Sequence, residues 1–191
     1  MVVLNKIYTR TGDGGETGVV TGERVAKTSP RIHAIGEVDE VNAAIGVALG
    51  QVTDETLRGT LLAVQNDLFD LGADLATPRQ IQGELRLRTG RVARLEEEID
   101  RINDALPALE SFVLPSGPGG AGTLHLARAV ARRAERAVWA LKETGEAVSD
   151  PVPHYLNRLS DLLFVAARHA SQSGGGEVLW VPGGGELEDE A

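Results

Sequence analysis

Apolar residues recur at intervals of three and four along most of the chain, as expected for helices with one buried face. The pattern predicts five helices, at about 30–50, 54–76, 91–106, 123–145 and 151–173. Alternation with a period of two, which would indicate strands, is scarce outside the two ends of the chain. The predicted fold class is therefore all-α: an up-and-down five-helix bundle, with a glycine-rich N-terminal loop lying across one end.

Capping and breaking residues locate several of these helix ends. Ser29 can cap the first helix and Pro30 suits its first position. The second helix must stop before Pro78, because the residue preceding a proline avoids the α conformation. Three glycines at 174–176 end the fifth helix, and the segment after them reads as a short strand. We expect a single domain over 1–182 and a disordered acidic tail over 183–191.

Composition narrows the classes of function. The 191 residues include no cysteine, which excludes disulfides, zinc–thiolate sites and cysteine nucleophiles and favours a reducing compartment. The net charge of −9 disfavours duplex nucleic acid as a partner. No leader-like or membrane-spanning apolar run is present, so we expect a cytoplasmic protein with no membrane partner. No metal site is predicted, because the histidines lack paired ligand spacing.

The fourth predicted helix carries an arginine stripe. Arg128, Arg132 and Arg136 stand at i, i+4 and i+8, and a helical wheel places His125 and Glu135 on the same face. Neighbouring like charges repel, and one glutamate does not neutralise three guanidinium groups. The stripe is either a solvated face, a partner for carboxylates of other helices, or a site for an anion such as a polyphosphate. The candidate carboxylates are those of Asp39, Glu40 and Asp161.

The glycine-rich segment 9–18 reads TRTGDGGETG and precedes every predicted helix. Its glycines, at 12, 14, 15 and 18, permit positive φ angles and a close approach of backbone N–H groups to an anion. Threonine hydroxyls add donors, and Lys27 can reach the same anion. The segment lacks the pattern of a Walker A loop or of a dinucleotide fingerprint. Alone, it could equally be a flexible terminal loop.

Five segments in this order resemble the PduO-type ATP:cob(I)alamin adenosyltransferases: TRTGDGGETG at 9–18, GEVDEVNAAIG at 36–46, FVLPSG at 112–117, LHLARAVARRAER at 124–136 and YLNRLSDLLFVAAR at 155–168. The resemblance extends from about residue 7 to residue 182. It implies a homotrimer of five-helix bundles, with ATP and cobalamin bound between adjacent subunits. It further implies that the 5′-deoxyadenosyl group of ATP, bound with Mg²⁺, moves to the cobalt of cob(I)alamin, releasing triphosphate.

The resemblance also implies roles for individual residues. The nucleotide contacts it implies are Thr9, Arg10, Thr11, Gly12, Thr17, Gly18, Lys27, Arg132, Glu135, Arg136 and Asn157. Of these, Lys27 and Arg132 would act in catalysis by holding the leaving triphosphate. An inter-subunit salt bridge would join Asp39 to Arg128. Phe112 would fill the lower face of the corrinoid and keep the lower axial ligand off; the alternative is that Phe112 is a packing residue of its loop.

The chain departs from the family pattern at two positions. Many members have lysine in place of Gly14, so a phosphate-binding charge is missing here, and many have leucine in place of Val41. The resemblance makes a flavin reductase and an adenosylcobalamin-dependent enzyme candidate partners. Two other functions stay open on the residues alone: a nucleotide-binding cobalamin chaperone or other transferase, and a helical scaffold without enzymatic activity.

Overall fold

The computed structural model describes residues 7–78 and 85–184 and contains the five predicted helices. They are α1 (Pro30–Leu49), α2 (Glu55–Leu75), α3 (Thr89–Asn103), α4 (Ala121–Glu143) and α5 (Pro151–Ser171), the last followed by the 3₁₀ turn η1 (Gln172–Gly174). The all-α prediction is confirmed. Of the predicted C-terminal tail, residues 185–191 lie outside the described part of the chain.

Helix ends agree best with prediction where a capping residue marks them. Ser29 caps α1 by accepting a hydrogen bond from the Ile32 amide, and Asp54 caps α2 by accepting one from the Leu57 amide at 2.7 Å. Helix α3 begins two residues before the predicted start and ends three before the predicted end. Its N-cap, Arg88, makes no side-chain capping hydrogen bond, so the sequence carried no signal for this boundary.

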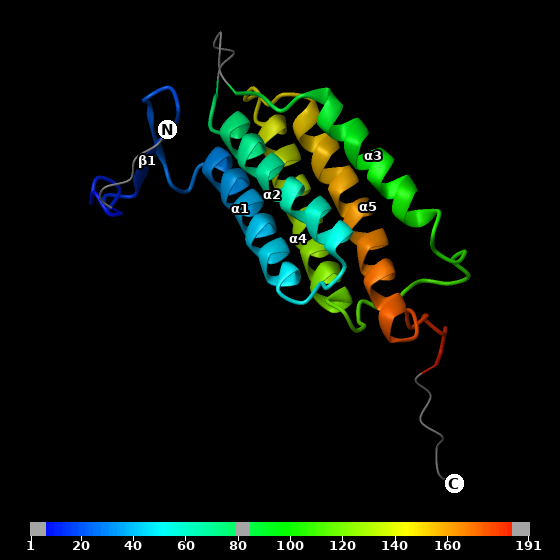
Figure 1. Ribbon diagram of the computed structural model, residues 1–191. Helices are drawn as coiled ribbons and strands as arrows, with labels where there is room; N and C mark the ends of the chain where they lie inside the picture. The colour runs from blue at the N-terminus through cyan, green and yellow to red at the C-terminus, as the bar shows by residue number, and fades with distance from the viewer. Residues whose placement is uncertain (1–6, 79–84, 185–191) are drawn as a thin grey trace.

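Helix α4 lies between α1 and α5 and packs closely against both (Figure 1). Alanines at 127, 131 and 134 are fully buried along α4 and let the neighbouring helices approach. Helix α2 packs on α1, and α3 packs on α5. Buried Asp67 links α2 to the other side of the bundle. It accepts a hydrogen bond from Tyr155 of α5 at 3.0 Å and is ion-paired to Arg94 of α3.

The two ends of the bundle differ in what they carry. At one end, buried Arg31 of α1 donates hydrogen bonds to the carbonyls of Leu75 and Ala147, which joins the start of α1 to the end of α2 and to the loop between α4 and α5. We call this the hairpin end, because the N-terminal segment leaves from it. At the other end, the loop before α4 meets the segment that follows α5, and a β-bridge pairs Val113 with Leu179. The strand predicted after α5 is thus confirmed in part.

The N-terminal segment forms a small hairpin that the sequence analysis did not predict. Strands β1 (Glu16–Gly18) and β2 (Arg24–Ala26) pair antiparallel, with Thr17 opposite Val25. The hairpin projects outward beside the start of α1 rather than lying across the end of the bundle (Figure 1). One hydrogen bond ties it to α2, from the Val20 amide to the Ala76 carbonyl at 3.1 Å.

Candidate active site

The arginine stripe of α4 is present on the surface of the single chain. Arg132 and Arg136 are exposed, and Arg128 is half-buried. Within the described residues none of the three is ion-paired; Arg136 donates one hydrogen bond, to the backbone carbonyl of Arg132 at 3.1 Å. The Nε of Arg128 is buried without a hydrogen-bond partner among these residues. The stripe therefore has unused hydrogen-bonding capacity for an anion or a neighbouring subunit.

Most other arginines of the described chain are ion-paired, which sets the stripe apart. Carboxylates pair with the guanidinium groups of Arg24, Arg31, Arg58, Arg86, Arg91, Arg94, Arg101, Arg133, Arg158 and Arg168. Since the chain is acidic overall, a run of unpaired arginines on one helix face is not the result of a shortage of carboxylates.

The carboxylates predicted as partners for the stripe do not meet it within the chain. Glu40 of α1 pairs with Arg133, together with Glu37 at 2.5 Å. Asp161 lies 3.7 Å from Arg158 on its own helix. Asp39 is exposed, and no ion pair forms between it and any described residue. The ion pairs that join α1 to α4 thus use Arg133, which follows Arg132 of the stripe in the sequence.

The helical wheel was wrong about His125. Its side chain is only 3 % exposed and its ring lies against Phe164, with the ring centroids 6.1 Å apart. Burial, followed by the nearby charge of Arg128, lowers the pKa of His125, while Glu177 acts in the opposite direction. The Nδ1 atom is buried without a hydrogen-bond partner among the described residues. His125 therefore faces the packed interior rather than the polar face.

The glycine-rich segment has a defined turn structure at its centre. Gly15 has φ of 88°, and Arg10 is the one non-glycine described residue with positive φ, at 63°. Of the four glycines that permit positive φ, only Gly15 adopts it; Gly12, Gly14 and Gly18 do not. Amide–carbonyl hydrogen bonds from Asp13 to Arg10 and from Gly15 to Gly12 close two successive turns.

Lys27 lies against this turn. Its amide donates to the Gly15 carbonyl at 2.8 Å, and its Nζ lies 3.2 Å from the point that a β-carbon at Gly12 would occupy. Gly12 is therefore required by a close approach and not by its φ angle. The Lys27 ammonium has no ion pair within the described residues, so a cation stands beside the backbone of Gly12. In the same segment the hydroxyls of Thr9 and Thr11 lie 2.8 Å apart.

The remaining predicted nucleotide contacts lie on three elements. Thr17 and Gly18 belong to β1, and Glu135 and Asn157 are half-buried on α4 and α5. Asn157 accepts a hydrogen bond from Arg158 at 2.7 Å. No hydrogen bond or ion pair of Arg10 or Lys27 reaches α4 or α5 within the described residues. A single chain thus does not bring the loop and the stripe into contact.

Phe112 lies at the opposite end of the bundle from the hairpin. It is 78 % exposed, so core packing, the alternative weighed for it, does not apply in the single chain. Its ring meets the edge of the Trp180 ring, with centroids 6.0 Å apart. The sequence analysis missed Trp180, although the strand-like segment that contains it was the available signal.

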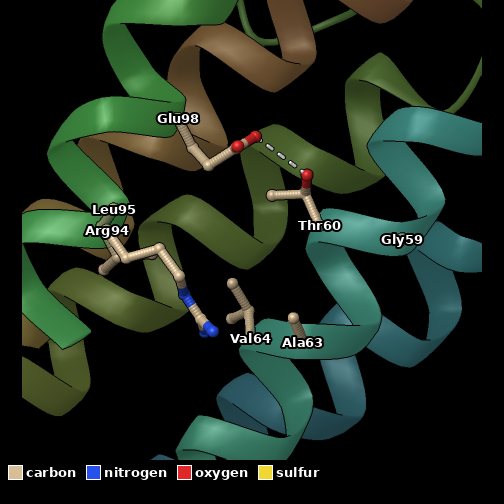
Figure 2. Close-up of a pocket in the computed structure, with 7 residues that line it drawn as sticks. All are labelled: Gly59, Thr60, Ala63, Val64, Arg94, Leu95 and Glu98. Carbon is tan, nitrogen blue, oxygen red and sulfur yellow. Dashed lines mark hydrogen bonds between the residues drawn. The ribbon is translucent and has the colours of Figure 1, made fainter.

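A cavity of about 240 Å³ lies elsewhere, between α2 and α3. Figure 2 shows that Thr60 and Glu98 bridge its walls through a hydrogen bond of 3.0 Å and that Arg94 reaches between the helices. None of the predicted site residues lines this cavity, which is enclosed by Gly59, Thr60, Ala63, Val64, Arg94, Leu95 and Glu98. We therefore do not assign the active site to it.

Comparison with known families settles the class of protein. Residues 7–170 match the family described as cobalamin adenosyltransferase. The chain belongs to the cobalamin adenosyltransferase family. The match covers the glycine-rich loop, the Phe112 loop and all five helices to the last turn of α5. The similarity of this chain to the family is therefore not confined to one motif.

Individual relatives agree with this family. The chain is 50 % identical to a corrinoid adenosyltransferase of Mycobacterium leprae over 189 residues, covering 95 % of this chain and 98 % of that protein. It is 42 % identical to the human corrinoid adenosyltransferase MMAB over 98 % of this chain and 78 % of that protein.

A solved structure shares the fold. It is a variant of the PduO-type ATP:corrinoid adenosyltransferase from Lactobacillus reuteri, complexed with cobalamin and ATP. The two structures superpose with a TM-score of 0.86 and the sequences are 36 % identical. The superposition covers 92 % of this chain and 99 % of that chain. Among residues 7–78 and 85–184, no helix combines the length and apolarity that crossing a membrane requires.

Proposed function

We propose that this adenosyltransferase moves the 5′-deoxyadenosyl group of ATP to the cobalt of cob(I)alamin, using the stripe of α4 and the glycine-rich loop as its nucleotide site. The observation that carries the assignment of the site is the unpaired stripe, because most other arginines of the described residues are ion-paired with carboxylates. A triphosphate supplies the anion that Arg132 and Arg136 lack.

The proposed reaction needs little acid–base chemistry from the protein. Co(I) attacks the C5′ carbon, the Co–C bond forms, and the bond from C5′ to the triphosphate oxygen breaks, with its electron pair leaving on the triphosphate. The protein aligns the two reactants and stabilises the negative charge that grows on the leaving group. Lys27, Arg132 and Arg136 serve the second task, and the loop residues Thr9, Arg10, Thr11, Gly12, Thr17 and Gly18, with Glu135 and Asn157, serve the first.

The described residues contain no cluster of three or more His, Asp or Glu side chains that could hold a metal ion. The described residues by themselves do not form a dedicated Mg²⁺ site. We propose that Mg²⁺ arrives on the triphosphate, whose oxygens suit it. No step of the proposed mechanism depends on a protein ligand to this ion.

Phe112 is proposed as the residue on the lower face of the corrinoid. Apart from the edge contact with Trp180, the Phe112 ring is exposed in the single chain, and an apolar ring suits the corrin face rather than solvent. Filling that face excludes the lower axial ligand, which makes reduction of Co(II) to Co(I) easier. Phe112 thereby acts before adenosyl transfer.

The proposed site is shared between subunits. The loop and Phe112 lie at opposite ends of the bundle, which α4 spans with 23 residues, or about 34 Å of helix (Figure 1). Cobalt and C5′ must come within bonding distance, so a second chain has to supply one of the two elements. A homotrimer with a repeated head-to-tail contact does this at every interface. Asp39 and Arg128, both unpaired in the single chain, are proposed to pair across that contact.

Mixing two variants tests the sharing. We expect Lys27→Ala and Phe112→Ala homotrimers each to be weakly active from cob(II)alamin. If the elements come from different chains, trimers reassembled from equal amounts should regain wild-type pairs at about a quarter of the sites. If one chain supplied both elements, mixing would restore no activity.

The reaction itself is tested by absorbance. Enzyme, ATP, cob(II)alamin and a strong reductant should give the light-sensitive Co–C bond of adenosylcobalamin. A protein that binds ATP without forming this bond would be a chaperone or another transferase, and one that does not bind ATP would be a scaffold. We further propose the cytoplasm as its location, with a flavin reductase upstream and an adenosylcobalamin-dependent enzyme downstream.

A further inference from the structure

The loop that carries Phe112 is held by pairing with the segment after α5. The Leu114 amide donates to the Val178 carbonyl at 2.8 Å, and the Trp180 amide donates to the Phe112 carbonyl at 2.7 Å. The Ser111 hydroxyl donates to the Trp180 carbonyl at 2.8 Å. We call residues 111–114 and 178–181 the ribbon. A two-stranded pairing of this length is marginal in water, so the exposed position of Phe112 needs further support.

That support comes from Arg168 in the last turn of α5. Its side chain is 2 % exposed, and its guanidinium group contacts the root of both ribbon strands. Nε donates to Glu177 at 2.9 Å, at the root of the second strand. A terminal nitrogen donates to the Pro107 carbonyl at 2.7 Å, on the chain that leads into the first strand. Glu177 is itself largely buried by this pair.

The loop is also seated against the end of α5 beyond the ribbon. A β-carbon at Gly174 would lie 2.2 Å from the Pro118 ring, and one at Gly119 would lie 2.8 Å from the Ala170 carbonyl. These approaches leave no space for a side chain at Gly119 or Gly174. The loop is thus attached to the end of α5 on both sides, through Pro107 before Phe112 and through Pro118 and Gly119 after it. The ion pair of Arg168 and Glu177 is the polar part of this attachment.

We propose that Glu177 and Arg168 are positioning residues for the reaction, because their buried ion pair holds the ribbon so that the Phe112 ring is presented to the corrinoid. This inference rests on the proposed role of Phe112 and adds residues that do not touch the substrate. Breaking the pair should misplace the ring without altering the loop at the hairpin end or the arginines of α4. Misplacement by about 1 Å can lower a rate by up to about 100-fold.

Glu177→Gln tests the proposal, with Glu96→Gln as the matched control. Glu96 pairs with Arg158, also on α5, at 2.8 Å on the exposed outer face of the bundle. For Glu177→Gln we expect a loss of four-coordinate cob(II)alamin in the presence of ATP, and a fall of kcat/KM for cob(II)alamin of about 10- to 100-fold. KM for ATP, and transfer to cob(I)alamin supplied already reduced, should change little. Glu96→Gln should resemble wild type in each measurement.

A cross-link separates positioning from general destabilisation. Val113 and Leu179 are directly opposite in the ribbon, flanked by its hydrogen bonds, and such pairs have closely spaced β-carbons. Because the chain has no cysteine, Val113→Cys with Leu179→Cys gives one defined disulfide. Added to Glu177→Gln, the oxidised disulfide should restore the four-coordinate species, and reducing it should remove that species again.

The outcomes distinguish this inference from the function on which it rests. If Phe112→Ala abolishes the four-coordinate species and Glu177→Gln leaves it intact, the positioning role is wrong and the role of Phe112 stands. If Phe112→Ala leaves the species intact, the role of Phe112 itself is wrong. A Glu177→Gln protein that loses ATP binding together with the species, and regains neither when the Val113→Cys/Leu179→Cys disulfide is added and oxidised, would show that the pair only maintains the fold.

Discussion

Arg132 and Arg133 are adjacent in the sequence, yet only Arg133 is ion-paired, to Glu37 of α1 at 2.5 Å. Arg132 is exposed and has no carboxylate partner within residues 7–78 and 85–184. Arg133 joins α4 to α1, and Arg132 is available to a ligand.

Arg132→Ala should lower kcat/KM for ATP by about 10- to 100-fold, since a charge-assisted hydrogen bond to phosphate is lost. Both KM and kcat should change, because the triphosphate is held in the ground state and more strongly in the transition state. Initial rates at varied ATP provide the measurement. Arg88→Ala, which removes an exposed arginine at the start of α3, is the control. Equal kinetics for the two variants would mean that the stripe is not the triphosphate site.

Gly12→Ala should raise the Kd for ATP by about fivefold, equivalent to about 1 kcal/mol. The added methyl group would lie 3.2 Å from the Lys27 Nζ and from the Glu16 carbonyl, so the lysine must move away from the turn. Gly14→Ala meets no atom within 4 Å and serves as the control. ATP binding measured by calorimetry compares them. If Gly14→Ala weakened binding as much as Gly12→Ala, the position of Lys27 beside Gly12 would be irrelevant to the nucleotide.

Arg128→Ala should weaken the trimer. In the proposed assembly its partner is Asp39 of a neighbouring chain, and truncating one member of a desolvated interface pair costs about 2–5 kcal/mol. Sedimentation should show dissociation at concentrations at which the wild type is trimeric. The charge swap Asp39→Arg with Arg128→Asp should restore assembly better than either single reversal. Single and double variants that all sediment like wild type would exclude the pairing.

The sequence predicted local features better than the relations between distant ones. Ser29 and Asp54 mark their helix starts because a cap acts on the next turn of the same chain. The hairpin escaped prediction because its strands have only three residues each, too few for a visible alternation. His125 was placed on the polar face because a wheel assigns faces by angle and does not record that Phe164 of α5 covers that side. The stripe itself was predictable, whereas its lack of carboxylate partners depends on packing.

His125→Leu should flatten the dependence of stability on pH between about 7.5 and 5.5. Burial lowers the pKa of His125 in the folded state below the usual value of about 6.5, so the unfolded chain binds more protons in this range. That difference destabilises the native state as the pH falls, and removing the imidazole removes it. Thermal unfolding at a series of pH values measures the slope. His154→Gln, which removes an exposed imidazole on α5, is the control for the loss of a histidine. Equal slopes for wild type and His125→Leu would contradict the lowered pKa.

Phe112→Ala should separate lower-ligand displacement from adenosyl transfer. Without the ring, the lower face of the corrin can keep its axial ligand, so Co(II) stays five-coordinate and its reduction stays unfavourable. Activity should fall by about 100-fold or more from cob(II)alamin, but survive in part when cob(I)alamin is supplied, because the arginines and the loop are unchanged. Phe69→Ala is the matched control, since Phe69 is a comparably exposed phenylalanine on α2, with 72 % of its surface accessible.

The measurement that decides the role of Phe112 is the spectrum of cob(II)alamin with enzyme and ATP. Wild type and Phe69→Ala should show a four-coordinate species, and Phe112→Ala should not. The ribbon and its Trp180 ring remain in this variant, so a loss of signal is assigned to the missing phenyl ring and not to a displaced loop. A Phe112→Ala protein that still forms the species would leave Phe112 as a surface residue that packs on Trp180, and the lower face would have to be filled by another group.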